Sequence, residues 1–307
     1  MQILLEKYYD YFLKGNFQDK NNIDDNSEFN NFYKIIINLQ DITNNKNLIN
    51  DLNVFTNFFE SGPYKIRPFF NETRINEIKE KFEENENVSF NWFIPSPYLK
   101  SDYYSKDFIY SYPSTRECWA KVYIPIKPNY YIKTIIKLQE FINFLADKYD
   151  IYETGQCKFR KKEIANDSIV MRFSCKEHYE EFLNFLNNNK EIYEGFDTPN
   201  QFLPIDNHGL SIITDCGGSY NYFATRMIWD YMFECREKKE NVNIQKLIDF
   251  IINYDTKKDK IMRYDDQNVI EDFKYVLVSK LQNINDKEII ETLFNENKKI
   301  HTLKKRG

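Results

Sequence analysis

The sequence has few of the residues that build disulfide scaffolds or flexible linkers, and no excess of basic residues. Of its 307 residues, only five are Cys, eight are Gly and nine are Pro. The Cys residues are odd in number and form no CxxC pair, which argues against a disulfide framework and a four-thiolate zinc site and favours reduced thiols. Lys and Arg total 42 against 47 Asp and Glu, a formal charge of -5, so no global positive field attracts nucleic acid or an anionic membrane.

Long hydrophobic runs are absent too. The apolar start Ile3 to Leu5 is broken by charge at Glu6, so the N-terminus has no signal-peptide core. No apolar stretch reaches the roughly 18 residues that a membrane-spanning helix needs. We therefore predict a soluble, cytoplasmic protein. Secretion into a host cell stays open, because the signals of injected effectors have no reliable apolar signature.

The residues that are abundant predict a folded α+β protein. Aromatic residues make up 17% of the chain and hydrophobic residues 42%, the opposite of a disordered composition. Apolar residues at three- and four-residue spacing predict a helical N-terminal cap over residues 1–60 and a helical C-terminal extension over 241–307. Between them, residues 61–240 form the predicted core, a mostly antiparallel central sheet with flanking helices. We find no linker, so the three parts are expected to form one compact unit.

Periodicity within the core predicts alternating strands and helices. Strands are expected at 118–126, 151–161, 167–174 and 210–214, and helices at 130–149, 176–187 and 222–237. Residues 61–115 contain five Pro and are predicted to be irregular, apart from one helix near 74–83.

Sequence signatures of several enzyme classes are missing. The chain has no GxxxxGK[ST], GxGxxG, HExxH or GxSxG motif, which lowers the expectation of P-loop, dinucleotide, zincin or α/β-hydrolase chemistry. His178, in the first turn of a Glu-rich helix, is predicted to lie on the surface. His208, in the loop Asp206 to Gly209, is either a turn residue or an acid/base group.

Cations on the core strands are the first candidate site. Alternation places Trp119, Lys121 and Tyr123 on one face of their strand, Lys158 lies centrally on the next strand, and Arg172 interrupts an otherwise apolar third strand. A lone cation on a strand is more often a solvated outer-face residue. Three strands that each place a cation on the same face would instead form an anion pocket.

A glycine pair before a helix is the second candidate. Gly217-Gly218 leads into the predicted helix at 222–237, where backbone N–H groups can bind an anion, and Arg226 follows one turn later. The alternative is a tight turn in which Arg226 pairs with Asp230 or Asp215.

Together these elements resemble the HopA-type family of type III effectors over about residues 115–235. The motifs are short: Lys121-Val122-Tyr123, Cys157-Lys158-Phe159, Asp167-Ser168-Ile169-Val170-Met171, Phe202-Leu203-Pro204, Gly209-Leu210, and Asn221-Tyr222 with Arg226. The N-terminal segment Tyr8-Tyr9-Asp10-Tyr11-Phe12 shows a weaker resemblance to the same family. Relatives of this domain serve as the lyase component of class V lanthipeptide synthetases and are distantly related to the phosphothreonine lyases.

The resemblance implies a phosphoserine or phosphothreonine lyase that acts by β-elimination on a phosphorylated peptide or protein, without metal or organic cofactor. It implies Lys158 as the base, Lys121 and Arg226 as phosphate ligands, and Tyr123 as the acid, with Arg172 a further candidate ligand.

The chain departs from the family just before Arg226, where Asn221-Tyr222-Phe223 stands in place of Ser-aromatic-Gly. This makes Asn221 and Tyr222, with His208, candidate accessory residues. The alternative is a non-catalytic effector or protein-interaction module that keeps the fold and an anion pocket. The aromatic stretch 92–112 is then either its contact surface or a set of ordinary core aromatics.

Overall fold

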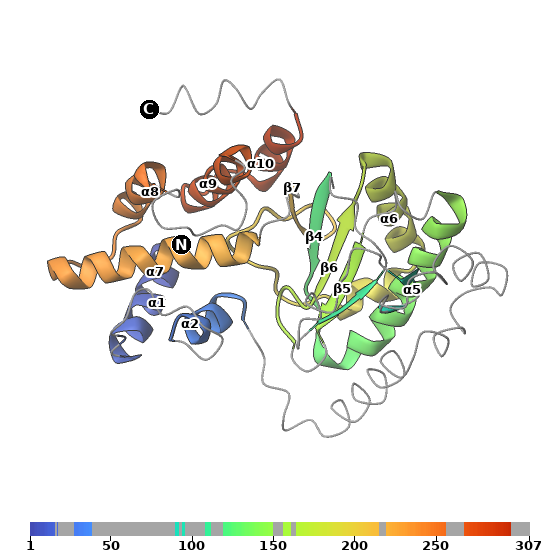
Figure 1. Ribbon diagram of the computed structural model, residues 1–307, viewed down its shortest axis with the longest axis horizontal. Coiled ribbons are helices and arrows are strands. Elements are labelled where there is room, and N and C mark those ends of the chain that lie inside the picture. The colour runs from blue at the N-terminus through green and yellow to red at the C-terminus, as the bar shows by residue number, and fades with distance from the viewer. Residues whose placement is uncertain are drawn as a thin grey trace. The chain divides into compact units, whose positions relative to one another are not determined.

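The fold is seen in a computed structural model of residues 1–307 (Figure 1). The structure describes residues 1–15, 17, 28–38, 90–91, 94–95, 108–111, 119–149, 156–160, 164–214, 219–255 and 267–295. Contacts within the chain group it into two compact units. One contains residues 1–39, 200–206 and 216–307, and the other contains residues 40–199 and 207–215. The boundaries predicted near residues 60 and 240 stay a prediction.

The second unit is built on a five-stranded sheet in which every neighbouring pair of strands is antiparallel. The strands follow the order β3-β5-β6-β4-β7. Their bounds are Phe108–Ser111 (β3), Ala120–Ile124 (β4), Gln156–Arg160 (β5), Ile169–Phe173 (β6) and Ser211–Thr214 (β7). A separate two-stranded ribbon joins β1 (Phe90–Asn91) to β2 (Ile94–Pro95).

One face of the five-stranded sheet is apolar and is covered by helices. The cross-strand pairs Ala120 with Phe173 and Val122 with Met171 lie on this face. The helices are α5 (Tyr131–Lys148) and α6 (Lys176–Asn188), which lie together on one side of the strands (Figure 1). The Phe173 ring lies 5.3 Å from that of Phe182 in α6, which itself lies 5.2 Å from Phe141 in α5. These rings join the sheet to both helices.

The described residues of this unit also include two short 3-10 helices, η3 (Pro128–Tyr130) before α5 and η4 (Lys190–Gly195) after α6. An isolated antiparallel bridge between Ile126 and Phe196 joins the segments beside them. Pro at the first position of η3 fits its role as a helix start, because the missing N–H has no intrahelical partner there.

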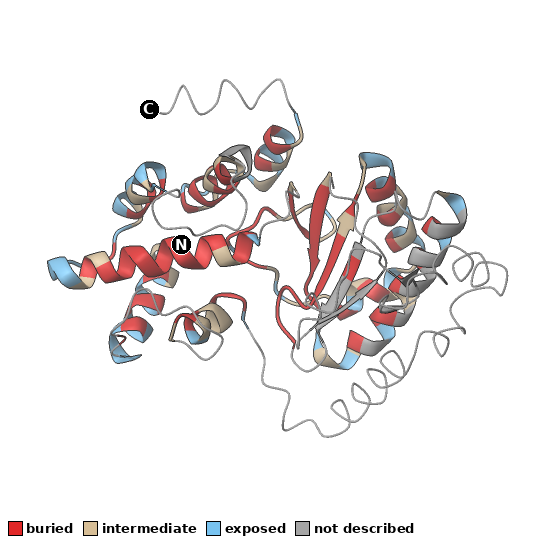
Figure 2. Ribbon diagram, in the orientation of Figure 1, coloured by how far each residue is buried: buried red, intermediate tan, exposed pale blue. Residues whose placement is uncertain are grey.

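The first unit is a set of helices around α7. Its helices are α1 (Gln2–Gly15), α2 (Glu28–Ile36), α7 (Tyr220–Lys238), α8 (Ile244–Asn253), α9 (Gln267–Leu281) and α10 (Asp286–Leu293). In α7, 14 of 19 residues are buried, so the helix is surrounded on most sides (Figure 2). Trp229 lies at its centre, with ring centroids 5.3 Å from Phe12 of α1 and 5.4 Å from Phe32 of α2.

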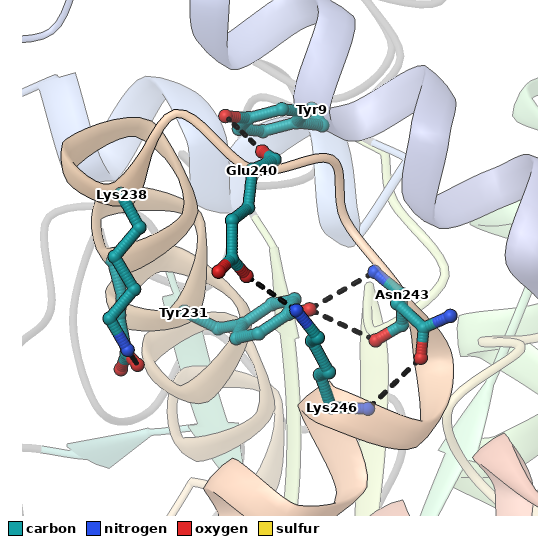
Figure 3. Close-up of polar contacts among 7 residues, drawn as sticks. Tyr9, Tyr231, Lys238, Glu240, Asn243 and Lys246 are labelled. Atoms are coloured by element: carbon teal, nitrogen blue, oxygen red, sulfur yellow. Dashed lines mark hydrogen bonds and ion pairs between the residues drawn. The ribbon is translucent and has the colours of Figure 1, made fainter.

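Polar contacts hold the connection between α7 and α8 in place (Figure 3). The Tyr231 hydroxyl donates to the Asn243 carbonyl and accepts from the Asn243 N–H, both at 3.0 Å. Lys246 Nζ bonds the Glu240 carboxylate at 2.6 Å, and the Tyr9 hydroxyl of α1 donates to the Glu240 carbonyl at 3.3 Å. Asn243 also caps α8 by accepting from the Lys246 N–H at 3.1 Å.

The α+β fold class and the antiparallel sheet predicted from the sequence are confirmed, but three local expectations are wrong. Residues 61–115 were expected to lack strands, yet Phe108–Ser111 forms an edge strand on β5. His178 is buried, with its ring 4.3 Å from that of Tyr149, and is not a surface residue. Trp119 was expected to belong to the same strand as Lys121, but β4 begins at Ala120, and the Trp119 ring packs 5.8 Å from that of Tyr179 in α6.

The predicted helix near 74–83 and most of the aromatic stretch 92–112 lie outside the described residues. Among the residues that the structure does describe, no helix is both long and apolar enough to cross a bilayer.

Candidate functional site

The strand register brings the predicted cations onto the second face of the sheet. Lys121 of β4 lies directly opposite Arg172 of β6. Lys158 of β5 lies opposite Val170 of β6, which in turn lies opposite Tyr123 of β4. Directly opposed residues in antiparallel strands belong to the same face, and residues two apart along a strand do as well. Positions 121, 123, 158 and 172 therefore share the face that is turned away from α5 and α6. We call it the cationic face.

Two described cations on this face are close and partly withdrawn from water. The Cβ atoms of directly opposed residues are about 4.5–5.5 Å apart, which is the spacing expected for Lys121 and Arg172. Lys121 is 7% exposed, and Arg172 is half-buried. Like charges placed opposite each other repel, and burial weakens the screening of that repulsion by water. A Lys ammonium and an Arg guanidinium on neighbouring strands can both bind one anion, and the guanidinium can bind two oxygens of a phosphate or carboxylate at once.

Tyr123 lies beside these cations with its side chain 4% exposed. On the edge strand β7, directly opposite Tyr123, lies Ser211, which the sequence analysis did not single out. Ser211 is 1% exposed, and its Oγ has no hydrogen-bond partner within the described part of the chain. The sequence carried a weak signal, since alternation along Ser211-Ile212-Ile213 puts a polar residue on one face. Only the pairing of β7 with β4 shows that this is the cationic face.

Arg226 belongs to the other unit and has a partner on its own helix. Its Nε donates to Oδ2 of Asp230, one turn later in α7, at 3.0 Å. The Tyr254 hydroxyl donates to the same carboxylate oxygen. Burial alone would lower the pKa of Arg226, but Asp230 and Tyr254 together outweigh burial and the pKa is raised, so the guanidinium stays charged. The pairing with Asp230 is one of the two alternatives that the sequence left open, and a phosphate-binding role for Arg226 stays a prediction.

Each of the accessory candidates Asn221, Tyr222 and His208 contacts other residues of the chain. Asn221 Oδ1 accepts from Asn200 Nδ2 at 2.7 Å, which ties the segment before Phe202 to the start of α7. Tyr222 packs edge-on against Phe29 at 5.3 Å, and burial raises its pKa, with Arg226 opposing the shift.

His208 stacks on Tyr193 at 6.3 Å in the loop before β7, next to Gly209 with φ of +81°. The accessory role predicted for Asn221, Tyr222 and His208 stays a prediction.

The described residues contain no cluster of three or more His, Cys, Asp or Glu side chains that could hold a metal ion. Cys157, Cys175 and Cys235 are not in disulfides, and burial raises the pKa of the Cys157 thiol strongly. Burial suppresses the thiolate, so Cys157 is unsuited to act as a nucleophile or metal ligand.

Comparisons with known proteins add one structural neighbour. No family model matches the chain. No curated protein matches it either. A solved structure to which the chain is similar is that of the effector protein from Pseudomonas syringae pv. syringae strain 61. The match has 12% sequence identity and a TM-score of 0.37, and it covers 80% of this chain and 90% of that one. The role of each residue therefore rests on the geometry of this chain itself.

Proposed function

We propose that the protein binds a phosphorylated peptide or protein at the cationic face and releases the phosphate by β-elimination. The observation that carries the proposal is the register of β4 and β6, which sets Lys121 directly opposite Arg172. A phosphate ester with two negative charges can accept charge-assisted hydrogen bonds from both cations through different oxygens, which a neutral ligand cannot match. Charge-assisted hydrogen bonds from the two side chains also stabilise the charge that gathers on the phosphate as it leaves.

In the proposed reaction Lys158, in its neutral form, removes the Cα proton of phosphoserine or phosphothreonine. The electron pair of the Cα–H bond forms the Cα=Cβ double bond, and the Cβ–O bond breaks. Its electron pair stays with the phosphate oxygen, toward which the Tyr123 hydroxyl donates a hydrogen bond. The products are a dehydroamino acid and inorganic phosphate, and neither water nor an electron carrier takes part. The register supports this division of roles because it puts Lys158 and Tyr123 on one face, in the same row across β5, β6 and β4.

Such a reaction would suit either of two settings, modification of a host protein by an injected effector or maturation of a lanthipeptide precursor. Both use the same chemistry at the peptide, so the cationic face would serve either one.

A second candidate is a module that binds the phosphorylated partner without turnover. It is favoured by the contacts of Arg226, because a guanidinium that already pairs with Asp230 at 3.0 Å is less available as a third phosphate ligand. Fewer cationic ligands would leave the leaving group less stabilised while still allowing binding.

Mass spectrometry of phosphothreonine and phosphoserine peptides separates the two candidates. We expect wild-type protein to convert them to dehydrobutyrine and dehydroalanine peptides, while hydrolysis would give threonine and serine instead. Lys158→Ala should lose elimination but retain peptide binding, and Lys133→Ala, an exposed Lys of α5, should behave as wild type. Binding without any mass change in the wild type would favour the module, and unchanged turnover in Lys158→Ala would refute the assigned base.

A further inference from the structure

The buried hydroxyl of Ser211 calls for a partner that the described chain does not supply. Ser211 is 1% exposed, so water cannot easily hydrate it, and its Oγ makes no hydrogen bond within the described residues. The great majority of buried polar side chains in proteins are hydrogen-bonded, because an unsatisfied group forfeits the bonds it had with water. An orphan hydroxyl of this kind marks either a locally tolerated defect or a place where a ligand completes the bonding.

The position of Ser211 favours the ligand. It lies directly opposite Tyr123, and it lies diagonally from Lys121, whose own partner on β7 is Ile213. Diagonal neighbours across antiparallel strands are separated by about 7–8 Å, a gap that a phosphate with a hydrogen bond on each side can span. The other β7 position in this register on the cationic face is the apolar Ile213, so Ser211 is the place at which β7 presents a hydrogen-bond donor there.

We infer that Ser211 is a further ligand-binding residue, whose hydroxyl donates a hydrogen bond to an oxygen of the anion held by Lys121 and Arg172. This inference rests on the proposed function, since it assumes that an anion binds at the cationic face. It adds a neutral donor on the edge strand to the two cations on the central strands. A neutral donor helps to fix the orientation of a tetrahedral anion without adding a further positive charge to the site.

The test compares Ser211→Ala with Ser279→Ala in titration calorimetry with inorganic phosphate and with O-phospho-L-threonine. Ser279 is the matched control, since it is 0% exposed, its Oγ also has no hydrogen-bond partner among the described residues, and it lies in α9 of the other unit. We expect Ser211→Ala to weaken the binding of both probes about tenfold, as loss of a hydrogen bond to a charged group does, and Ser279→Ala to leave it unchanged. Ser211→Thr keeps the hydroxyl and should retain most of the affinity.

Stability without ligand provides the second readout. Because the Ser211 hydroxyl makes no hydrogen bond within the described residues, Ser211→Ala should melt at the same temperature as wild type or higher. A lower melting temperature would overturn the inference, as it would show a structural role for the hydroxyl. Equal phosphate affinity in wild type and Ser211→Ala would overturn it as well, while leaving the cationic face intact. If wild-type protein binds neither probe, the proposed function itself fails.

Discussion

The buried ion pair of α7 gives a prediction that depends on burial and not on sequence spacing. Arg226 and Asp230 have side-chain exposures of 5% and 0%, and their charged atoms lie 3.0 Å apart. The same helix carries a second pair at the same i,i+4 spacing, Lys238 with Glu234, whose side chains are 57% and 39% exposed. The two pairs share a helix and a spacing, although the cation comes first in the buried pair and the anion comes first in the exposed one. Their largest difference is in access to water, so the exposed pair of Lys238 and Glu234 serves as the control.

The expected effects differ widely. Removing one partner of a buried ion pair leaves an uncompensated charge in the interior, at a cost of about 3–5 kcal/mol. Arg226→Ala should therefore lower the free energy of unfolding by about that amount, a large share of the stability of a typical domain. Lys238→Ala should have little measurable effect, because water and salt screen an exposed pair. Replacing both buried partners, as in Arg226→Met with Asp230→Leu, should recover most of the loss, since no buried charge then remains.

Urea denaturation followed by Trp229 fluorescence measures these differences. Trp229 lies in the same helix and packs against Phe12 and Phe32. In a background with Trp92→Phe and Trp119→Phe it is the one remaining Trp of three, so its emission reports on this helical unit. The reasoning would be refuted if Arg226→Ala and Lys238→Ala shifted the midpoint equally. It would also be refuted if the double replacement were as unstable as Arg226→Ala alone.

Two further predictions concern titrating groups. Cys157 should resist alkylation by iodoacetamide in the native protein, while Cys175 reacts. The reason is that Cys157 is 1% exposed and has a raised pKa, whereas Cys175 is partly exposed. Peptide mapping that found Cys157 modified first would contradict this. Burial raises the pKa of Tyr8 from 10.0 to about 12, so the folded state disfavours its phenolate. The stability that this shift contributes is fully present below pH 10 and is lost as the pH rises toward 12, so the urea midpoint should fall over that range and fall less steeply in Tyr8→Phe. An identical slope in both proteins would show that Tyr8 does not contribute.

The sequence predicts most of the regular structure, because periodicity is a local property. The strand at Ala120–Ile124 and the helix at Tyr131–Lys148 follow from alternation and from a continuous apolar stripe. The strand Phe108–Ser111 escapes prediction because it has four residues and stands in a Pro-rich stretch, and only its pairing with β5 makes it a strand. The burial of His178 is not predicted either, because it involves the ring of Tyr149, which lies outside the helix of His178.

The candidate site depends on information that periodicity lacks. Alternation puts Lys121 and Tyr123 on one face of a strand, but it does not say which strand lies beside it or in which register. The pairing with β6 sets Lys121 opposite Arg172, and a slip of one residue would have put them on different faces. Ser211 was missed for the same reason, because a lone Ser on a short strand is informative only once its neighbour across the sheet is known.

A crystal structure of the protein with inorganic phosphate tests the central claim most directly. The account predicts one phosphate bound between Lys121 Nζ and the Arg172 guanidinium, on the face of the sheet away from α5 and α6. Phosphate bound only elsewhere, or a cationic face that remains empty at saturating phosphate, would contradict it.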